Sequence, residues 1–217
     1  RDGDPKGDAI VIDGPSEPGG PLRLESGGDI AGDRVVIIET NEDLVEHDVV
    51  ENVSSRDAGE RSRHPPCDPA VPLDELSDAV APDAVIAVDV GNNTYSFGRY
   101  FECRAQTVLM SGYLGSIGFG VPAAMGAWAA VQADGSGRQI VAVAGDGGLG
   151  QYLAELTTLV KYSMNITVVV LNNGQLGKIS KEQRAAEFDV WQTSLVNPSF
   201  CDVARLCGMP AHRVEMA

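Results

Sequence analysis

Short apolar runs alternate with longer amphipathic stretches along the chain from residue 71 onward. Apolar runs of strand length, rich in β-branched residues, lie at 84–91, 139–147 and 165–173. Stretches in which apolar residues recur at helical spacing lie at 72–80, 115–132, 150–162 and 198–208. Strands without a polar face are typical of parallel sheets covered by helices on both sides. The pattern therefore predicts an α/β fold, a doubly wound parallel sheet with helices on both faces.

The stretch 150–162 has the clearest helical pattern. Leu149, Leu153, Leu156 and Val160 follow one another at spacings of four, three and four residues. These spacings place the four side chains on one face of a helix. We therefore expect a single helix here, packed against the sheet and starting near residue 150.

Residues 1–70 are different in composition, being rich in Gly, Pro and Asp. They hold 17 acidic and seven basic side chains, so about −10 of the formal net charge of −15 lies in this part. Only AIVI (9–12) and RVVIIET (34–40) have the character of strands. Two interpretations stay open for residues 1–70: an acidic Gly/Pro-rich extension, or the remnant of a middle domain. Residues 71–217 form the main domain.

The acidic balance excludes some classes of partner. With a pI near 4.4, the chain lacks the clustered Lys and Arg that a nucleic-acid binder uses to displace counterions. It has no apolar run near 18 residues and no signal-type N-terminus. We therefore expect no nucleic-acid partner, no membrane span and, by default, a cytoplasmic protein.

Polar residues gather where the predicted strands end, which is where ligands bind in doubly wound sheets. Asp146 and Asn173 each follow an apolar run, and one predicted helix lies between them. This βαβ spacing puts both residues at the same edge of the sheet, about 4.8 Å apart if the strands are neighbours. One Mg²⁺, with ligand bonds of about 2.1 Å, can bridge such a gap.

A Mg²⁺ held by so few protein oxygens predicts a phosphorylated ligand, because this ion usually keeps phosphate oxygens and waters. Gly147 and Gly148 can bring backbone N–H groups close to a phosphate without side-chain obstruction. Asn92 and Asn93, after the first strand, can donate further hydrogen bonds. GDG and NNG are also common turn sequences, so periodicity and spacing alone leave a purely structural interpretation open.

The same residues resemble a known family. GDG (145–147), followed by 24 residues and then NN (172–173), resembles the thiamin-diphosphate motif of enzymes such as pyruvate oxidase, acetolactate synthase and pyruvate decarboxylase. VDVGNN (88–93) resembles the loop at the diphosphate, and SGYLGSIGFGVPAAMGA (111–127) resembles the segment under the thiazolium ring. The resemblance covers about residues 72–215. It implies the thiamin-diphosphate-binding fold, in incomplete form, over 71–217.

The resemblance also implies roles for matching positions. Asp146 and Asn173 would bind Mg²⁺ by side chain and Gln175 by its backbone carbonyl. Ile117 would be the apolar wedge that bends thiamin diphosphate, and the Gly115 carbonyl would accept a hydrogen bond from its exocyclic amine. The implied cofactor-binding positions are Gly91, Asn92, Asn93, Gly115, Ile117, Gly145, Asp146, Gly147, Gly148, Asn173, Gln175 and Gly177.

Among the subfamilies, LNNGQLGKISKEQ (171–183) looks most like the pyruvate oxidase and quinone-dependent pyruvate dehydrogenase branch. Ile179 and Glu182 match positions that face the substrate there. Glu182 is either an active-site acid or a solvated partner of Lys178, four residues earlier. Flavin-using relatives often have an aromatic residue at the position of Lys178, which leaves the use of FAD open.

The implied function is decarboxylation of pyruvate by a thiamin-diphosphate enzyme of the pyruvate oxidase or dehydrogenase type. The alternatives are acetolactate synthase, a non-oxidative 2-oxo-acid decarboxylase, or a non-catalytic thiamin-diphosphate-binding fragment. The family takes a catalytic Glu from a pyrimidine-binding domain, which nothing in residues 1–70 resembles. We therefore expect a fragment, split subunit or inactive copy that needs such a domain or subunit as partner, and a homo-oligomer that acts on a small 2-oxo acid.

Overall fold

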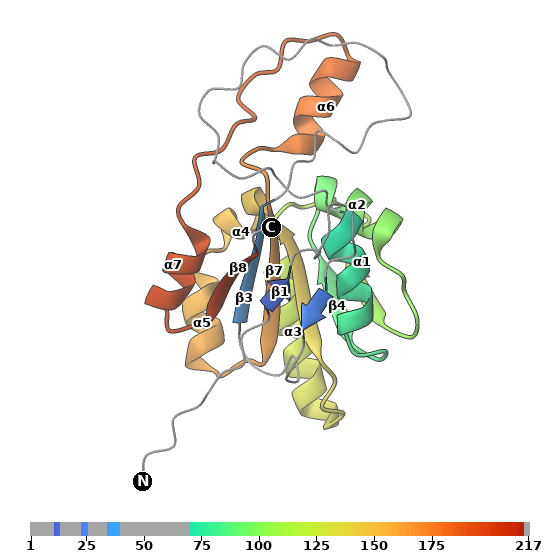
Figure 1. The fold of residues 1–217 in the computed structure, drawn as a ribbon, viewed down its shortest axis with the longest axis vertical. Helices are drawn as coiled ribbons and strands as arrows, with labels where there is room; N and C mark the ends of the chain where they lie inside the picture. Colours follow the sequence, from blue (N-terminus) through green and yellow to red (C-terminus); the bar gives the residue numbers. More distant parts are fainter. Residues whose placement is uncertain (1–10, 14–22, 26–33, 40–69, 215–217) are drawn as a thin grey trace.

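The computed structural model describes residues 11–13, 23–25, 34–39 and 70–214 (Figure 1). Its helices are α1 (Ala70–Ala79), α2 (Asn92–Tyr100), α3 (Gly120–Asp134), α4 (Asp146–Gln151), α5 (Glu155–Lys161), α6 (Gly177–Ala185) and α7 (Phe200–Leu206). Its strands are β1 (Val11–Asp13), β2 (Arg23–Glu25), β3 (Arg34–Glu39), β4 (Val85–Val88), β5 (Thr107–Met110), β6 (Ile140–Gly145), β7 (Ile166–Asn172) and β8 (Ala211–Val214).

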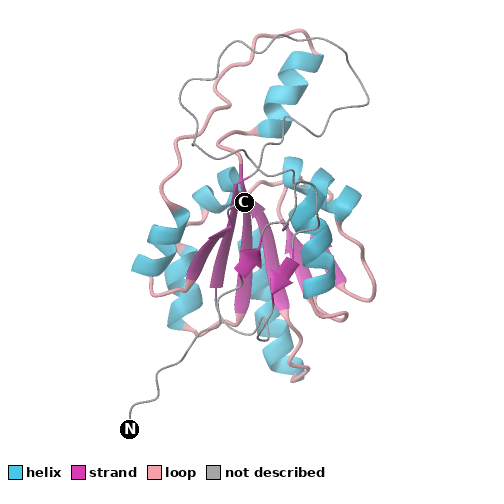
Figure 2. Cartoon of the chain, viewed as in Figure 1, coloured by secondary structure: helices cyan, strands magenta, loops and turns pink. Residues whose placement is uncertain are grey.

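Six strands form one sheet in the order β5-β4-β6-β7-β3-β8, and every neighbouring pair is parallel. Strands β1 and β2 form a separate antiparallel pair. Helices flank the large sheet as covering layers (Figure 2). The predicted α/β class and parallel sheet are confirmed.

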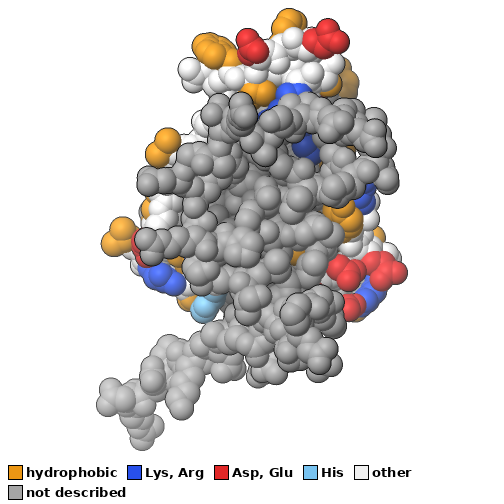
Figure 3. Space-filling model, turned by 45° about the horizontal axis from the view of Figure 1, so that its top comes forward, with side chains coloured by type: hydrophobic (Ala, Val, Ile, Leu, Met, Phe, Trp, Pro, Cys, Tyr) orange, Lys and Arg blue, Asp and Glu red, His pale blue; other side chains and the backbone are white. Residues whose placement is uncertain are grey.

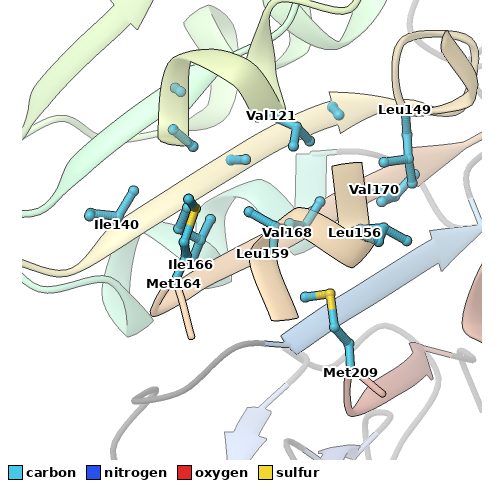
Figure 4. Packing of buried hydrophobic residues seen from close by; sticks show 14 of the residues in the cluster. Val121, Ile140, Leu149, Leu156, Leu159, Met164, Ile166, Val168, Val170 and Met209 are labelled. Atoms are coloured by element: carbon cyan, nitrogen blue, oxygen red, sulfur yellow. The ribbon is translucent and has the colours of Figure 1, made fainter. Parts of the chain in front are cut away.

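Two hydrophobic clusters show why the central strands carry no polar face. Successive residues of a strand point to opposite faces, so Val141 packs with α1 and α2 while Ala142 packs with α3 and α5. The α3 and α5 side is the larger cluster, in which Val121, Leu156 and Val168 are almost fully buried (Figure 4). Both faces of β6 and β7 are thus core, and their polar residues can only follow the strand ends.

Three expectations change in the structure. The predicted helix 150–162 is two short helices, α4 and α5, joined by a tight turn in which Tyr152 and Glu155 donate backbone bonds to the residues three positions earlier. Hydrogen bonds between residues three positions apart tighten the backbone, and they interrupt the regular hydrogen bonding of an α-helix. The apolar face is nevertheless as predicted, since Leu149 and Leu156 are buried. Helix α4 begins at Asp146, not near residue 150.

The third change concerns RVVIIET. Residues 34–39 form β3, which lies between β7 and β8 in the same sheet as the strands after residue 70. The sheet therefore takes one strand from before residue 70. The division of the chain near that residue otherwise stays a prediction, and most of residues 1–70 lie outside the described part. Within the described residues, no helix has the length and apolar character to cross a membrane.

Candidate functional site

The ends of β6 and β7 bring Asp146 into contact with the loop that follows β7. The two strands are parallel neighbours, as their spacing in the sequence predicted. The Gly174 backbone N–H donates to Asp146 Oδ2 at 3.0 Å. In the same loop, Asn173 Oδ1 accepts the Gln175 N–H at 3.1 Å. The three residues with predicted metal-binding roles therefore belong to one small region, while the roles themselves stay predictions.

Asn197 is a residue of this region that the sequence analysis missed. Its Nδ2 donates to Asp146 Oδ2 at 2.6 Å and to Asn172 Oδ1 at 2.9 Å. The segment just before it runs beside the loop after β7, where Leu176 N–H donates to Thr193 O at 2.7 Å. Asn197 thus ties two strand ends together from a stretch that has neither helical nor strand periodicity, so no pattern pointed to it.

The Asp146 carboxyl group is buried among neutral donors. Only 3% of the residue is exposed, and this burial raises the pKa of the carboxyl above its ordinary value. Hydrogen bonds from Asn197, Gly147 and Gly174 lower the pKa in part. None of these donors carries a positive charge. A divalent cation beside Asp146 would supply that charge, so the donor set fits a metal-binding carboxylate.

Within the described residues, no three His, Cys, Asp or Glu side chains lie close enough together to hold a metal ion. The predicted site is of another kind, with one carboxylate (Asp146), one side-chain amide oxygen (Asn173) and one backbone carbonyl (Gln175). These are the hard oxygen ligands that Mg²⁺ prefers, and the ion completes its shell with phosphate oxygens and waters. The arrangement therefore fits a cation that binds together with a phosphorylated ligand.

The loop after β4 lies against the end of β6. Asn93, at the start of α2, is buried, and its Nδ2 donates to Asp89 O at 2.9 Å. A Cβ on Gly91 would lie 2.7 Å from Asn93 Oδ1, and Gly91 has a φ of +148°. A Cβ on Gly145 would lie 3.5 Å from the same oxygen. The Asn93 side chain therefore lies between the glycine turns after β4 and β6, and there is no room for a side chain at Gly91.

Ile117, in the segment just before α3, reaches the GDG turn. A Cβ on Gly147 would lie 3.6 Å from Ile117 Cδ1, 3.3 Å from Leu195 Cδ1 and 2.8 Å from Leu176 Cδ2. Apolar side chains from three separate segments thus surround this glycine. Gly115 is exposed and has a φ of +59°, in the left-handed region that favours glycine. The structure therefore brings the predicted wedge residue and the predicted diphosphate turn together.

Two lysines of α6 lie beside the first residues of α2. Lys181 Nζ donates to Asn92 Oδ1 at 3.5 Å. Lys178 forms an ion pair with Glu182 and lies over the Tyr95 ring, 5.4 Å from its centroid. Glu182 was expected to be either an active-site acid or a partner of Lys178, and the ion pair with Lys178 is present. A role of Glu182 in catalysis stays a prediction.

Helix α6 lies beyond the end of the sheet, apart from the covering layers (Figure 1). It begins at the buried Gly177, and Ile179 is 44% exposed. The segment after it carries the exposed side chains of Phe188 and Trp191. Figure 3 shows hydrophobic and acidic side chains together at the top of the molecule. Helix α6 and the segment after it thus carry apolar side chains that are exposed to solvent.

Comparison with known proteins agrees with these features. The family model described as thiamine pyrophosphate enzyme, C-terminal TPP binding domain, matches residues 89–217. Thiamine pyrophosphate is another name for thiamin diphosphate. The matched range includes every predicted site residue from Gly91 to Glu182 and also Asn197.

Similar proteins are found in several organisms. A putative thiamine pyrophosphate-containing protein, YdaP, from Bacillus subtilis is 37% identical over 70% of this chain and 26% of its own length. The acetolactate synthase large subunit of Parasynechococcus marenigrum is 33% identical over 67% of this chain and 22% of its own length. Acetolactate synthase 1 of Nicotiana tabacum is 34% identical over 65% of this chain and 22% of its own length. The chain thus spans about a quarter of the length of these relatives.

The match of the family model over more than half of the chain shows that it belongs to the thiamine pyrophosphate enzymes, whose C-terminal cofactor-binding domain it carries.

Proposed function

We propose that this chain holds the diphosphate end of thiamin diphosphate, together with Mg²⁺, in a 2-oxo-acid enzyme of the acetolactate synthase type. The observation that carries the proposal is the buried Asp146 carboxyl group, which is surrounded by neutral donors and touched by the loop after β7. The relatives named as acetolactate synthases favour this type over the pyruvate oxidase type that the GKISKEQ segment resembles.

In this proposal, the metal ligands are the Asp146 carboxylate, the Asn173 side-chain oxygen and the Gln175 backbone carbonyl. Asn197 already donates to Asp146 Oδ2, so it would keep the carboxylate in one orientation. Such outer hydrogen bonds commonly orient metal ligands. The metal would neutralise charge on the diphosphate, which a chain with a net charge of −15 would otherwise repel.

The diphosphate would be bound by the backbone N–H groups of Gly147 and Gly148 and by Asn92. Asn93 is buried and donates to the Asp89 carbonyl, so we assign to it the task of holding the loop in place. Lys181 Nζ lies beside Asn92 and brings a positive charge to this loop. Backbone donors and one nearby cation are a common way to bind phosphate groups.

Thiamin diphosphate, when bound, supplies the nucleophilic carbon and the electron sink for loss of CO₂ from a 2-oxo acid. The chain's own residues orient it. Ile117 would press between the two rings so that the cofactor is held bent, and the Gly115 carbonyl would accept a hydrogen bond from the exocyclic amine. This is catalysis by positioning. A pyrimidine-binding domain, from another chain or another part of the protein, would supply the catalytic Glu.

Calorimetric titration of the chain with thiamin diphosphate tests the proposal. We expect binding in Mg²⁺, loss of binding in EDTA, and at least a roughly hundredfold loss of affinity in Asp146→Asn, which cannot offer a charged ligand. Asp83→Asn is the matched control, because Asp83 is exposed in a turn. Binding that is equally strong in EDTA, or in Asp146→Asn, would refute the proposed site.

A pyruvate oxidase type is the second candidate, favoured by the resemblance of residues 171–183, in which Ile179 and Glu182 lie on α6. The two types differ in products. We would add a pyrimidine-binding domain and pyruvate, and then measure acetolactate and the reduction of an electron acceptor separately. Acetolactate with no reduced acceptor supports the synthase type. A reduced acceptor, together with the absorption spectrum of a bound flavin, supports the oxidase type.

A further inference from the structure

Asp89 is a buried carboxyl group to which the proposed function gives no role. It directly follows β4, and only 1% of it is exposed. Its Oδ1 accepts the backbone N–H groups of Val90 at 2.6 Å, Gly118 at 2.8 Å and Phe119 at 3.2 Å. Burial raises the pKa of this carboxyl, and hydrogen bonds from these three N–H groups and from that of Gly120 lower it in part. Asp89 is therefore surrounded by donors.

Three of these donors belong to the start of α3. The 15-residue helix begins at Gly120, and Phe119, at its N-cap position, offers no side-chain hydrogen bond. The first N–H groups of a helix have no partner within the helix, and a carboxylate there is also favoured by the helix dipole. Asp89, which follows β4, accepts these N–H groups in place of an N-cap side chain.

The same carboxyl group lies against the GDG turn. A Cβ on Gly148 would lie only 2.3 Å from Asp89 Oδ2. Ile117 immediately precedes Gly118, whose N–H Asp89 accepts, and its Cδ1 lies 3.6 Å from the place of a Cβ on Gly147. Asp89 thus contacts both segments whose relative position decides how far Ile117 stands from the diphosphate turn.

We propose that Asp89 is a positioning residue, which caps α3 from the end of β4 and thereby holds Ile117 at a fixed distance from the Gly147–Gly148 turn. The inference rests on the proposed function, because the distance matters only if a ligand spans the turn and the wedge. It also explains the choice of Asp at this position. The N–H groups of Val90, Gly118 and Phe119 share one oxygen, Oδ1, and a charged carboxylate oxygen is a stronger acceptor than the neutral oxygen of an Asn side chain.

Titration with two ligands distinguishes a positioning role of Asp89 from a general effect on the stability of the fold. Inorganic pyrophosphate with Mg²⁺ would engage the turn and the metal ligands alone, whereas thiamin diphosphate would also contact Ile117. In Asp89→Asn, we expect the affinity for thiamin diphosphate to fall roughly tenfold more than the affinity for pyrophosphate. Asn keeps the volume beside Gly148 and leaves the Asp89 backbone carbonyl in place for Asn93.

The control is Ser77→Ala on α1, away from the candidate site. It removes a buried hydroxyl that donates to Leu73 O and accepts the Glu102 N–H. We expect it to change the two affinities equally or not at all. Amide hydrogen exchange is the second measurement. Exchange at Gly118 and Phe119 should accelerate in Asp89→Asn and stay unchanged in Ser77→Ala.

The outcomes are distinct. Equal losses for the two ligands in Asp89→Asn, or unchanged exchange at Gly118 and Phe119, would overturn the positioning role while the proposed function stands. If the unmodified chain binds neither ligand in Mg²⁺, the proposed function fails and the positioning role fails with it. A selective loss for thiamin diphosphate together with faster exchange supports the role.

Discussion

Two buried aspartates follow neighbouring strands, Asp89 after β4 and Asp146 after β6, and their surroundings differ. Burial raises the pKa of both carboxyl groups. Asp89 is held mainly by backbone N–H groups at the start of a long helix, a fixed environment. Asp146 accepts hydrogen bonds from the Asn197 side chain and from the backbone N–H groups of Gly147 and Gly174. Similar burial is thus combined with different donors: the start of a long helix at Asp89, and an amide side chain with a loop at Asp146, where we propose the ligand site.

A methyl group added next to Asp89 is expected to have the largest effect, and it tests whether the surroundings of Asp89 are rigid. In Gly148→Ala, the Cβ would lie 2.3 Å from Asp89 Oδ2, so the backbone or the carboxyl group must move. We expect a loss of about 2–3 kcal/mol in the free energy of unfolding, measured by urea denaturation. Gly150→Ala, in the same helix and with open space around the Cβ, should instead gain up to about 1 kcal/mol. Equal effects of the two substitutions would contradict a rigid scaffold.

Removal of the side chain that holds Asp146 should weaken the metal site. Asn197→Ala leaves Asp146 Oδ2 and Asn172 Oδ1 without the donor that they share. We expect the affinity for Mg²⁺, titrated in the presence of pyrophosphate, to fall roughly ten- to hundredfold, as for other residues that orient metal ligands. Gln132→Ala, exposed on α3, is the control. An unchanged Mg²⁺ affinity in Asn197→Ala would show that Asp146 is oriented by other groups.

Neutralising Asp146 should stabilise the ligand-free protein, in contrast to its effect on binding. Its carboxyl group is buried among neutral donors, so the charged form is disfavoured in the folded chain. We expect Asp146→Asn to raise the free energy of unfolding in EDTA by about 1 kcal/mol, a common exchange between stability and function at binding sites. A clear loss of stability would mean that Asp146 has a structural role, as we propose for Asp89.

The smallest effect concerns the pH dependence of stability. Because the pKa of Asp89 is raised in the folded chain, its contribution to stability is present at low pH and is lost as the pH rises through the folded-state pKa. The contribution of Asp89 to the free energy of unfolding should therefore rise as the pH falls from 7 toward the ordinary Asp value of 3.8. Asp89→Asn should show a smaller rise than the unmodified chain. An identical slope in the variant would mean that Asp89 has similar pKa values in the folded and unfolded chains.

The sequence pattern was sufficient for the sheet core and for the resemblance to the family. Runs such as 139–147 and 165–173 record local burial, and parallel strands buried on both faces leave a clear signal. β5 was missed because it is a four-residue edge strand, only partly buried. The break between α4 and α5 was missed because Leu153 continues the apolar spacing across it.

The site could be predicted only where its residues directly follow strands. Asp146 and Asn173 do so, which made their proximity deducible from topology. Asn197 comes from a loop that returns to the sheet edge, and Asp89 acts on a helix that starts much later in the chain. Hydrogen bonds between such distant segments have no periodic pattern in the sequence, and they become apparent only in the folded chain.

The position of β3 has a consequence for how the chain assembles. Arg34 pairs with Thr167 and Val35 pairs with Ala211, so this early strand completes its hydrogen bonding only with segments that are synthesised much later. Contacts between residues so far apart in sequence carry a large loop-closure cost and slow the acquisition of the native topology. On the ribosome, the half of the sheet that contains β4 and β6 can therefore form first, and β3 must be captured between β7 and β8 at a late stage.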